Sequence, residues 1–173
     1  FIPNRARTRV FENSELSPSV EADYVTGGKQ MIVSAEVIKA GVLPDPKLFF
    51  GFEELEFCLR VKDAGFKILV DGDGIREARH KAGNFDNNYR WKGKSIGDSS
   101  RINRQYYSIR NMLYILWSRG HYLGYGFFFT KNLIKIPLSL KYGFSYFKKF
   151  FSLTLIAIFH QWRGRYGQYI STR

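Results

Sequence analysis

The chain has 173 residues and carries 27 Lys+Arg against 15 Asp+Glu, which gives a formal net charge of +12. This length suits one domain with a real core, or one piece of a larger domain, and excludes two independent enzymatic domains. With 45% hydrophobic and 17% aromatic residues, the chain is too apolar to be disordered.

The lone cysteine and the first residue each limit what the chain can be. Cys58 is the single cysteine, which excludes an intrachain disulfide framework and a multi-cysteine zinc site. The chain begins with Phe1, and residues 1–9 resemble neither a signal peptide nor a transit peptide. We therefore expect a fragment whose N-terminus lies elsewhere.

The first predicted elements are short. Residues 5–22 read as a loop, and residues 24–26 and 30–33 read as extended backbone on either side of the pair Gly27-Gly28. Ser34 is a suitable N-cap for a two-turn helix over 35–40, which Gly41 ends.

A second helix is predicted to begin at Glu53 and Glu54, directly after an aromatic and glycine-containing loop, and to end at Gly65. A short strand over 66–70 should follow, and the residues of 71–74, Asp-Gly-Asp-Gly, are typical of a turn. Another strand is expected over 75–80. The next stretch, 81–101, is polar and contains glycine.

The C-terminal part is basic and aromatic. Cutting the chain after Asn88 leaves 12 basic and 14 acidic residues before the cut, and 15 basic residues and one acid after it. Apolar residues at helical spacing predict a long amphipathic helix over 101–119. The division predicts two parts, residues 1–88 and a basic, aromatic, amphipathic helical tail over 89–173.

The tail's apolar runs are interrupted by lysines, and the longest uncharged run, 150–162, is 13 residues long. A membrane span needs about 20 apolar residues. Such segments suit the interface of a membrane, with aromatic faces toward the acyl chains and Lys or Arg toward anionic headgroups. The alternative is that the same aromatic residues form an ordinary core.

Carboxylates are the first candidates for chemistry. Glu53, Glu54 and Glu56 would stand at the rim of any pocket that the preceding loop lines, which is where a general base is needed. The structural alternative is strong, because acids in a first turn are favoured by the helix macrodipole and Glu56 can pair with Arg60 at i,i+4.

Three weaker signals remain. His80 at the end of a strand could reach a metal or a phosphate, although a lone histidine is more often a surface residue. Asp71 and Asp73 have a spacing that can bind a divalent ion, and we favour the turn. Gly27 and Gly28 would let a sugar or phosphate approach the backbone, or would form a bulge.

The order of these motifs is more specific than any one of them. The segments 24–33, 49–60, 65–68 and 78–80, which read YVTGGKQMIV, FFGFEELEFCLR, GFKI and ARH, resemble the C-terminal half of a family 2 glycosyltransferase of the rhamnosyltransferase-like kind. The resemblance covers about residues 23–83 and continues more weakly through Tyr106-Tyr107 and Arg110-Asn111 to residues 164–167.

The resemblance implies an α/β fold, the C-terminal half of a Rossmann-like nucleotide-sugar (GT-A type) domain, followed by amphipathic helices. It implies that Glu54 is the base that deprotonates the acceptor hydroxyl, with Glu53 in reserve, although the family usually has Asp at that position. It also implies that His80 helps to hold a divalent metal, Mg or Mn. Gly27, Gly28 and Arg60 are then the substrate-binding residues.

We therefore expect an inverting glycosyltransferase fragment that lacks the family's nucleotide-binding N-terminal half. Its partners would be a nucleotide-sugar donor, a glycan or lipid-linked acceptor and an anionic membrane, with no nucleic acid, and it would lie peripherally on the cytoplasmic face of the cell membrane in cell-surface polysaccharide synthesis. Two alternatives stay open, a basic nucleic-acid-binding module and a non-catalytic, membrane-associated interaction protein.

Overall fold

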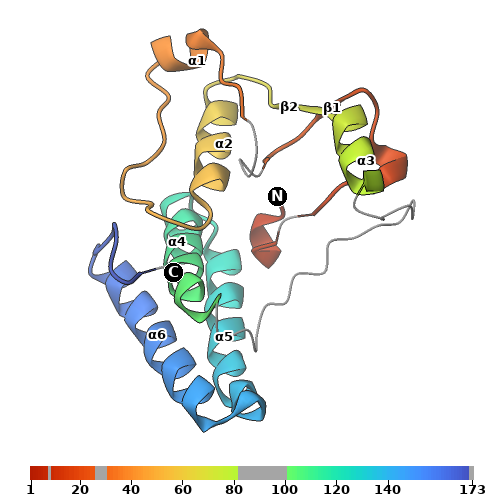
Figure 1. Cartoon of the computed structure of the whole chain (residues 1–173). Coiled ribbons are helices and arrows are strands. Elements are labelled where there is room, and N and C mark those ends of the chain that lie inside the picture. Colours follow the sequence, from red (N-terminus) through yellow and green to blue (C-terminus); the bar gives the residue numbers. More distant parts are fainter. Residues whose placement is uncertain (8, 26–30, 82–100, 172–173) are drawn as a thin grey trace. The chain divides into compact units, whose positions relative to one another are not determined.

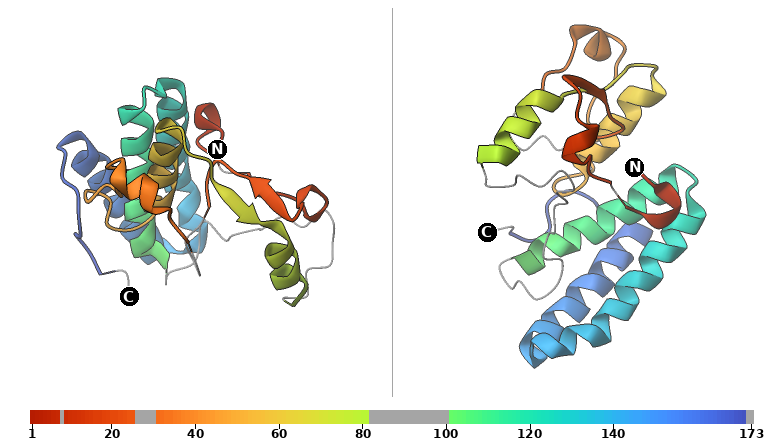
Figure 2. Two further views of the ribbon diagram at one scale, coloured as in Figure 1. Left: turned by 90° about the horizontal axis from the view of Figure 1, so that it is seen from above. Right: turned by 90° about the vertical axis from the view of Figure 1, so that its right-hand side faces the viewer.

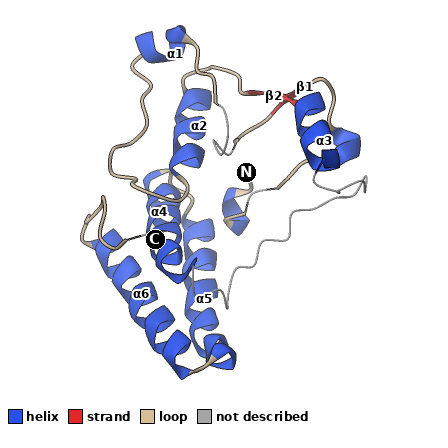
Figure 3. Ribbon diagram, viewed as in Figure 1, coloured by secondary structure: helices blue, strands red, loops and turns tan. Residues whose placement is uncertain are grey.

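A computed structural model of the chain describes residues 1–7, 9–25, 31–81 and 101–171 (Figure 1). Helices predominate in this part of the chain, and its sheet consists of two short antiparallel strands (Figure 3). A Rossmann-like domain needs parallel strands that alternate with helices. The expected α/β fold is therefore wrong for the described residues, which form a mainly helical structure.

The chain divides into two compact units. Unit 1 comprises Phe1, Thr8–Pro44 and Glu54–Gly93, and unit 2 comprises Ile2–Arg7, Asp45–Glu53 and Lys94–Arg173. The boundary that we expected after Asn88 lies outside the described residues.

The sheet of unit 1 pairs β1, Ser19–Glu21, with β2, Leu69–Asp71, and Val20 faces Val70 in the register. The strand predicted over 66–70 is thus confirmed only in its last residues. The described residues of 24–25 and 31–33 form no strand, and Gly27 and Gly28 lie outside the described residues.

A helix replaces the strand predicted over 75–80. This helix, α3, spans Gly72–Lys81. The cause is local: a carboxylate oxygen of Asp71 accepts a hydrogen bond from the backbone N–H of Gly74 at 2.9 Å, as an N-cap does, so the turn residues start a helix. Arg79 then donates to the side-chain oxygen of Asn13 at 2.7 Å and ties α3 to the N-terminal segment.

The two predicted N-terminal helices are confirmed. Helix α1, Ala35–Lys39, has Ser34 as its N-cap, and helix α2 spans Glu53–Asp63. The two helices meet in a small apolar core, where residues spaced at three and four along the chain face inward. Its buried members are Val37, Phe57 and Val61.

Unit 2 is built on three helices, α4 (Ile102–Ser118), α5 (Tyr122–Leu138) and α6 (Phe144–Trp162). Figure 2 shows α5 and α6 running side by side in opposite directions. The predicted amphipathic helix over 101–119 is confirmed as α4, whose apolar face is buried. Where α4, α5 and α6 join, the core contains Ile102, Ile136, Tyr146 and Phe150.

A close backbone contact with α5 holds one more element of unit 2. A 3₁₀ turn, Pro3–Arg5, lies against α5, and a Cβ added at Gly124 would stand 2.0 Å from the carbonyl oxygen of Pro3. Only glycine fits there. Among the described residues, no helix combines the length and the apolarity that a bilayer crossing requires.

Candidate functional site

The predicted carboxylates begin a helix behind an unusual loop. Residues 45–52, called here the α2 loop, lead into α2, whose first two residues are Glu53 and Glu54. Gly51 has φ 79° and Phe52 has φ 66°, so both are left-handed. A left-handed residue other than glycine costs roughly 1–3 kcal/mol and persists only where surrounding contacts impose it. Those contacts come from α4.

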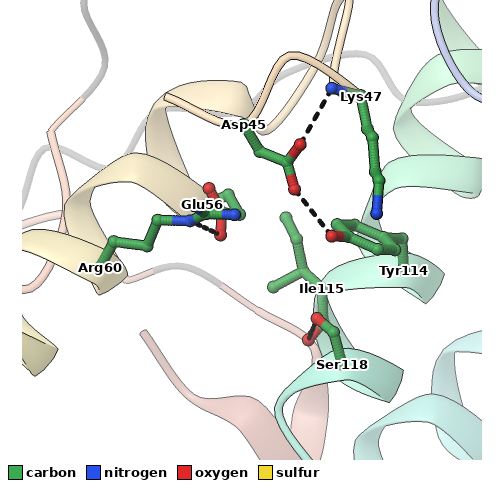
Figure 4. Close-up of polar contacts among 7 residues, drawn as sticks. All are labelled: Asp45, Lys47, Glu56, Arg60, Tyr114, Ile115 and Ser118. Carbon is green, nitrogen blue, oxygen red and sulfur yellow. Dashed lines mark hydrogen bonds and ion pairs between the residues drawn. The ribbon is translucent and has the colours of Figure 1, made fainter. Parts of the chain in front are cut away.

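Asp45 anchors the start of the α2 loop (Figure 4). One carboxylate oxygen accepts the backbone N–H of Lys47 at 2.9 Å, and the other accepts the hydroxyl of Tyr114 on α4 at 2.7 Å. Asp45 is buried, which makes these bonds necessary, because an unpaired buried carboxylate would be costly. The turn at Asp45 is thereby fixed to the middle of α4.

Asn111 anchors the end of the same loop, one turn earlier on α4. Its side-chain amide donates to the carbonyl oxygens of Phe50 at 2.7 Å and Gly51 at 2.8 Å. A Cβ built on Gly51 would lie 3.1 Å from Oγ of Ser108, also on α4. The left-handed backbone therefore lies directly on the helix surface, and its two carbonyl groups face a buried pair of donors.

Aromatic contacts hold the side chains of the α2 loop. The ring of Tyr107 lies 5.4 Å from the ring of Phe49 and 6.1 Å from that of Phe50, and Arg104 stands 5.6 Å above the Phe50 ring. Such tilted and edge-on aromatic pairs add about 0.5–1.5 kcal/mol each beyond their buried area. The loop is thus held by backbone and by side chains to one face of α4.

Arg110 is a fully buried cation next to this anchor. Its Nε donates to the side-chain oxygen of Asn111 at 3.0 Å, and one Nη donates to the hydroxyl of Tyr106 at 3.2 Å and to the carbonyl of Gly167 at 2.9 Å. Three tyrosine rings surround the guanidinium at 5.2–5.6 Å: Tyr106, Tyr107 and Tyr166. Within the described chain no carboxylate pairs with it, so ring faces and carbonyl oxygens balance its charge.

The segment after α6 covers this cluster. The hydroxyl of Tyr107 donates to the carbonyl of Ile170 at 2.6 Å and accepts the backbone N–H groups of Tyr169 and Ile170 at 3.0 and 2.9 Å. The backbone N–H of Gly167 in turn donates to the carbonyl of Lys47 in the α2 loop at 3.0 Å. One tyrosine hydroxyl therefore organises a turn of the C-terminal segment.

His160 extends the cluster to α6. Its Nδ1 lies 2.7 Å from the hydroxyl of Tyr106, which already accepts from Arg110. The hydroxyl proton can therefore point at a neutral imidazole. Burial, together with the positive charges of Arg165 and Arg110, lowers the pKa of His160 below its usual 6.5. Burial likewise raises the pKa of Tyr106.

The residues predicted from the sequence lie in different environments. Glu53 and Glu54 are half-buried at the start of α2, as expected. Arg60 bonds to Glu56 along α2, the i,i+4 pair that the sequence offered as a structural alternative. His80 is exposed in the last turn of α3, and not at the end of a strand. Burial raises the pKa of Cys58, which suits an inert thiol.

The described residues contain no ready set of ligands for the expected metal. Within residues 1–7, 9–25, 31–81 and 101–171, no cluster of three or more His, Cys, Asp or Glu side chains could hold an ion. His80 is therefore not part of such a cluster among the described residues. The metal remains a prediction from the sequence.

Sequence reasoning missed the residues that shape the loop. The pair Arg110-Asn111 belongs to the family resemblance alone, although the sequence also contains a more direct signal. Tyr106, Tyr107, Arg110 and Asn111 repeat at three and four on the face of α4 that the apolar residues define as buried. Buried polar residues at that spacing indicate a hydrogen-bond network. Asp45 lies in a loop, where no such spacing marks it in the sequence.

No protein-family model, curated protein sequence or solved structure matches this chain.

Substituting Gly51 tests how tightly the loop is held. Gly51→Ala should lower the free energy of unfolding by more than Gly41→Ala, because both positions are left-handed but only Gly51 has a neighbour, Ser108, within 4 Å. The backbone alone should cost about 1–2 kcal/mol. Urea unfolding measures both, and adding Ser108→Ala should bring Gly51→Ala down to the Gly41→Ala value. Equal losses in the two single variants would contradict the close contact.

The lowered pKa of His160 predicts a pH dependence of stability. Because the folded state binds this proton less readily than the unfolded state, the free energy of unfolding should be fully retained above pH 6.5 and should fall as the pH drops below it. Thermal unfolding between pH 8 and pH 5 measures the slope. His160→Gln, whose amide oxygen can still accept from Tyr106, should show a smaller slope, and an unchanged slope would contradict the assignment.

Proposed function

We propose that the chain is the acceptor-side part of an inverting glycosyltransferase that works at an anionic membrane surface in cell-surface polysaccharide synthesis. The observation that carries the proposal is the pair Glu53-Glu54, presented at the first turn of α2 by a left-handed loop that α4 pins. Strained backbone held by dedicated contacts is typical of functional positions. The succession of motifs resembling the family supports the same reaction, and the family's fold is no part of the proposal.

In the proposed reaction, this chain supplies the general base. The Glu54 carboxylate takes the proton of an acceptor hydroxyl, and the hydroxyl oxygen attacks the anomeric carbon of the donor sugar from the side opposite the leaving group. The bond from that carbon to the nucleoside diphosphate breaks, and the diphosphate leaves with the electron pair. Glu53 is the second candidate for the same role. A base placed in this way contributes typically 10²–10⁴-fold to rate.

Membrane docking is supported by the outer face of α6. Large apolar side chains on this face are 41–72% exposed and repeat at intervals of three, four and seven; we call them the α6 stripe: Phe144, Phe151, Leu155, Phe159 and Trp162. Lys148 and Lys149 are exposed on the same helix. A helix with an apolar face and lysines beside it suits the headgroup region of a bilayer.

Charge points to anionic lipid as the occupant of this face. The sequence has no acidic residue after Asp98, so α4, α5 and α6 carry only positive charge. Burial and the neighbouring charge of Lys131 lower the pKa of Lys135. An anionic surface relieves such like-charge repulsion. The cytoplasmic leaflet, rich in anionic lipid, is the surface that we propose.

Part of the aromatic tail follows the alternative that the sequence left open. Phe150, Tyr146 and Phe128 are buried among the helices of unit 2 and act as core. Only the remaining aromatics are accessible to lipid. A nucleic-acid-binding module would use exposed aromatics as stacking platforms with basic residues beside them. The exposed apolar side chains that repeat along one face of α6 favour a membrane over that alternative.

Replacing the proposed base tests the reaction. In the product of the complete gene, Glu54→Gln should lower turnover by about 10²–10⁴-fold with little change in donor binding, because the shape is kept and the base is lost. The measurement is release of nucleoside diphosphate from UDP- and dTDP-sugars, with the cell's own membrane fraction as source of acceptor. Glu53→Gln is measured in parallel, and an equal loss in Glu53→Gln with a nearly unchanged Glu54→Gln would contradict the assignment of the base to Glu54.

Vesicle binding tests the membrane surface. Replacing Lys141, Lys148 and Lys149 with Gln should weaken binding to phosphatidylserine-containing vesicles about 100-fold at low salt, since each lysine contributes about 1 kcal/mol. Replacing Phe151, Leu155 and Phe159 with Ser should remove the part of the binding that salt does not reverse. Co-sedimentation measures both.

The matched control for charge is Lys39, Lys67 and Lys81 to Gln, three exposed lysines of unit 1. These changes remove the same charge and should leave vesicle binding nearly unchanged. Equal loss in the two lysine triples would reduce the effect to net charge alone. Retention on single-stranded DNA with no binding to anionic vesicles would favour the nucleic-acid module instead.

A further inference from the structure

The side chain of Asn111 is fully buried and its polar atoms bond in three directions. Its amide nitrogen gives one hydrogen to the carbonyl of Phe50 and one to the carbonyl of Gly51, and its oxygen accepts from Arg110. An amide has two donor hydrogens and one carbonyl oxygen. Asn111 thus uses both donors on two consecutive peptide groups of the α2 loop.

This geometry requires asparagine. Aspartate would present only acceptors to two carbonyl oxygens, and leucine or alanine would leave both carbonyls without their buried donors. Glutamine is one methylene longer, so its amide could not occupy the same position on α4. The requirement arises from the loop, because the carbonyls that need donors belong to Phe50 and to the left-handed Gly51.

Arg110 sets the direction of the Asn111 amide. Its Nε donates to the asparagine oxygen, which turns the amide nitrogen toward the α2 loop. The guanidinium is itself held by Tyr106 and by the carbonyl of Gly167. Its second Nη has no hydrogen-bond partner within the described part of the chain, so the burial of Arg110 costs free energy. Its contact with Asn111 is one reason why an arginine is placed there despite this cost.

The two hydrogen bonds from Asn111 to the carbonyls of Phe50 and Gly51, called here the clamp, act where α2 starts. Gly51 is separated from Glu53 only by Phe52, whose left-handed backbone is unfavourable without outside contacts. Without the clamp, these residues can return to right-handed or extended backbone, which turns the first residues of α2. A displacement of about 1 Å at a reacting group can lower a rate about 10²-fold.

We propose that Asn111, oriented by Arg110, is a positioning residue for the carboxylates that begin α2. It touches no reacting atom and acts through the peptide groups of Phe50 and Gly51. The catalytic half of the proposal rests on the proposed function, and the clamp itself can be measured without any substrate.

Hydrogen exchange followed by mass spectrometry tests the clamp in the whole chain. Asn111→Asp removes both donors but can still accept from Arg110, so it is the variant least expected to unfold; Asn111→Ala is the second. Exchange of amides in residues 47–54 should rise about 10- to 100-fold in both. Peptides from α5 and α6 should change little.

Asn132→Ala is the matched control. Asn132 is also a buried asparagine on a helix of unit 2, and it donates to the carbonyl of Phe128 at 2.8 Å. This change should leave residues 47–54 at the wild-type exchange rate. Unchanged exchange at 47–54 in Asn111→Asp and Asn111→Ala, or an equal rise throughout unit 2, would overturn the clamp.

Kinetics of the complete gene product test the positioning role. Asn111→Asp should lower kcat about 10- to 100-fold and leave KM for the nucleotide sugar nearly unchanged, because the loop places a base and does not bind the donor. If exchange rises locally and Glu54→Gln is inactive, but kcat of Asn111→Asp equals wild type, the positioning role is wrong. If Glu54→Gln and Glu53→Gln both keep full activity, the proposed function fails, and with it the positioning role, whereas the exchange result still decides the clamp.

Discussion

The polar face of α4 is the constraint on which the described site depends. Arg110 is a buried guanidinium that pairs with no carboxylate of the described residues and lies among tyrosine rings. It directs an asparagine amide at the loop before α2. Removing any one partner leaves a buried polar group unsatisfied, which costs about 1–3 kcal/mol. The network therefore links three segments distant in sequence: the α2 loop, α4 and the chain after α6.

The network also gives the strained loop a physical cause. Left-handed Gly51 and Phe52 are a local cost, and the contacts of Asp45, Asn111 and Tyr107 offset it from outside. Local cost balanced by tertiary contacts is the usual arrangement at positions that must present a side chain in one direction. Here the residues so presented are two adjacent carboxylates, which is why the loop, and not the sheet, carries the functional proposal.

Sequence patterns predicted the elements whose signals are local. Ser34 capping α1, the acids that open α2 and the apolar periodicity of α4 were sufficient to place those helices. The strand expected over 75–80 failed because its identity depended on Asp71, which can either close a turn or cap a helix. The α/β fold failed because it was inferred from a resemblance, whereas the strands present are three residues long and antiparallel.

The uniform sign of charge over α4, α5 and α6 has a consequence for behaviour in plain buffer. With no acid after Asp98, these helices have no attractive ion pairs of their own, and the lowered pKa values of Lys131 and Lys135 reflect burial and cationic neighbours. Dissolved salt screens that mutual repulsion while it also weakens attraction to a charged surface. Ionic strength should therefore act with opposite signs on the two properties, making the helical unit harder to unfold and easier to detach.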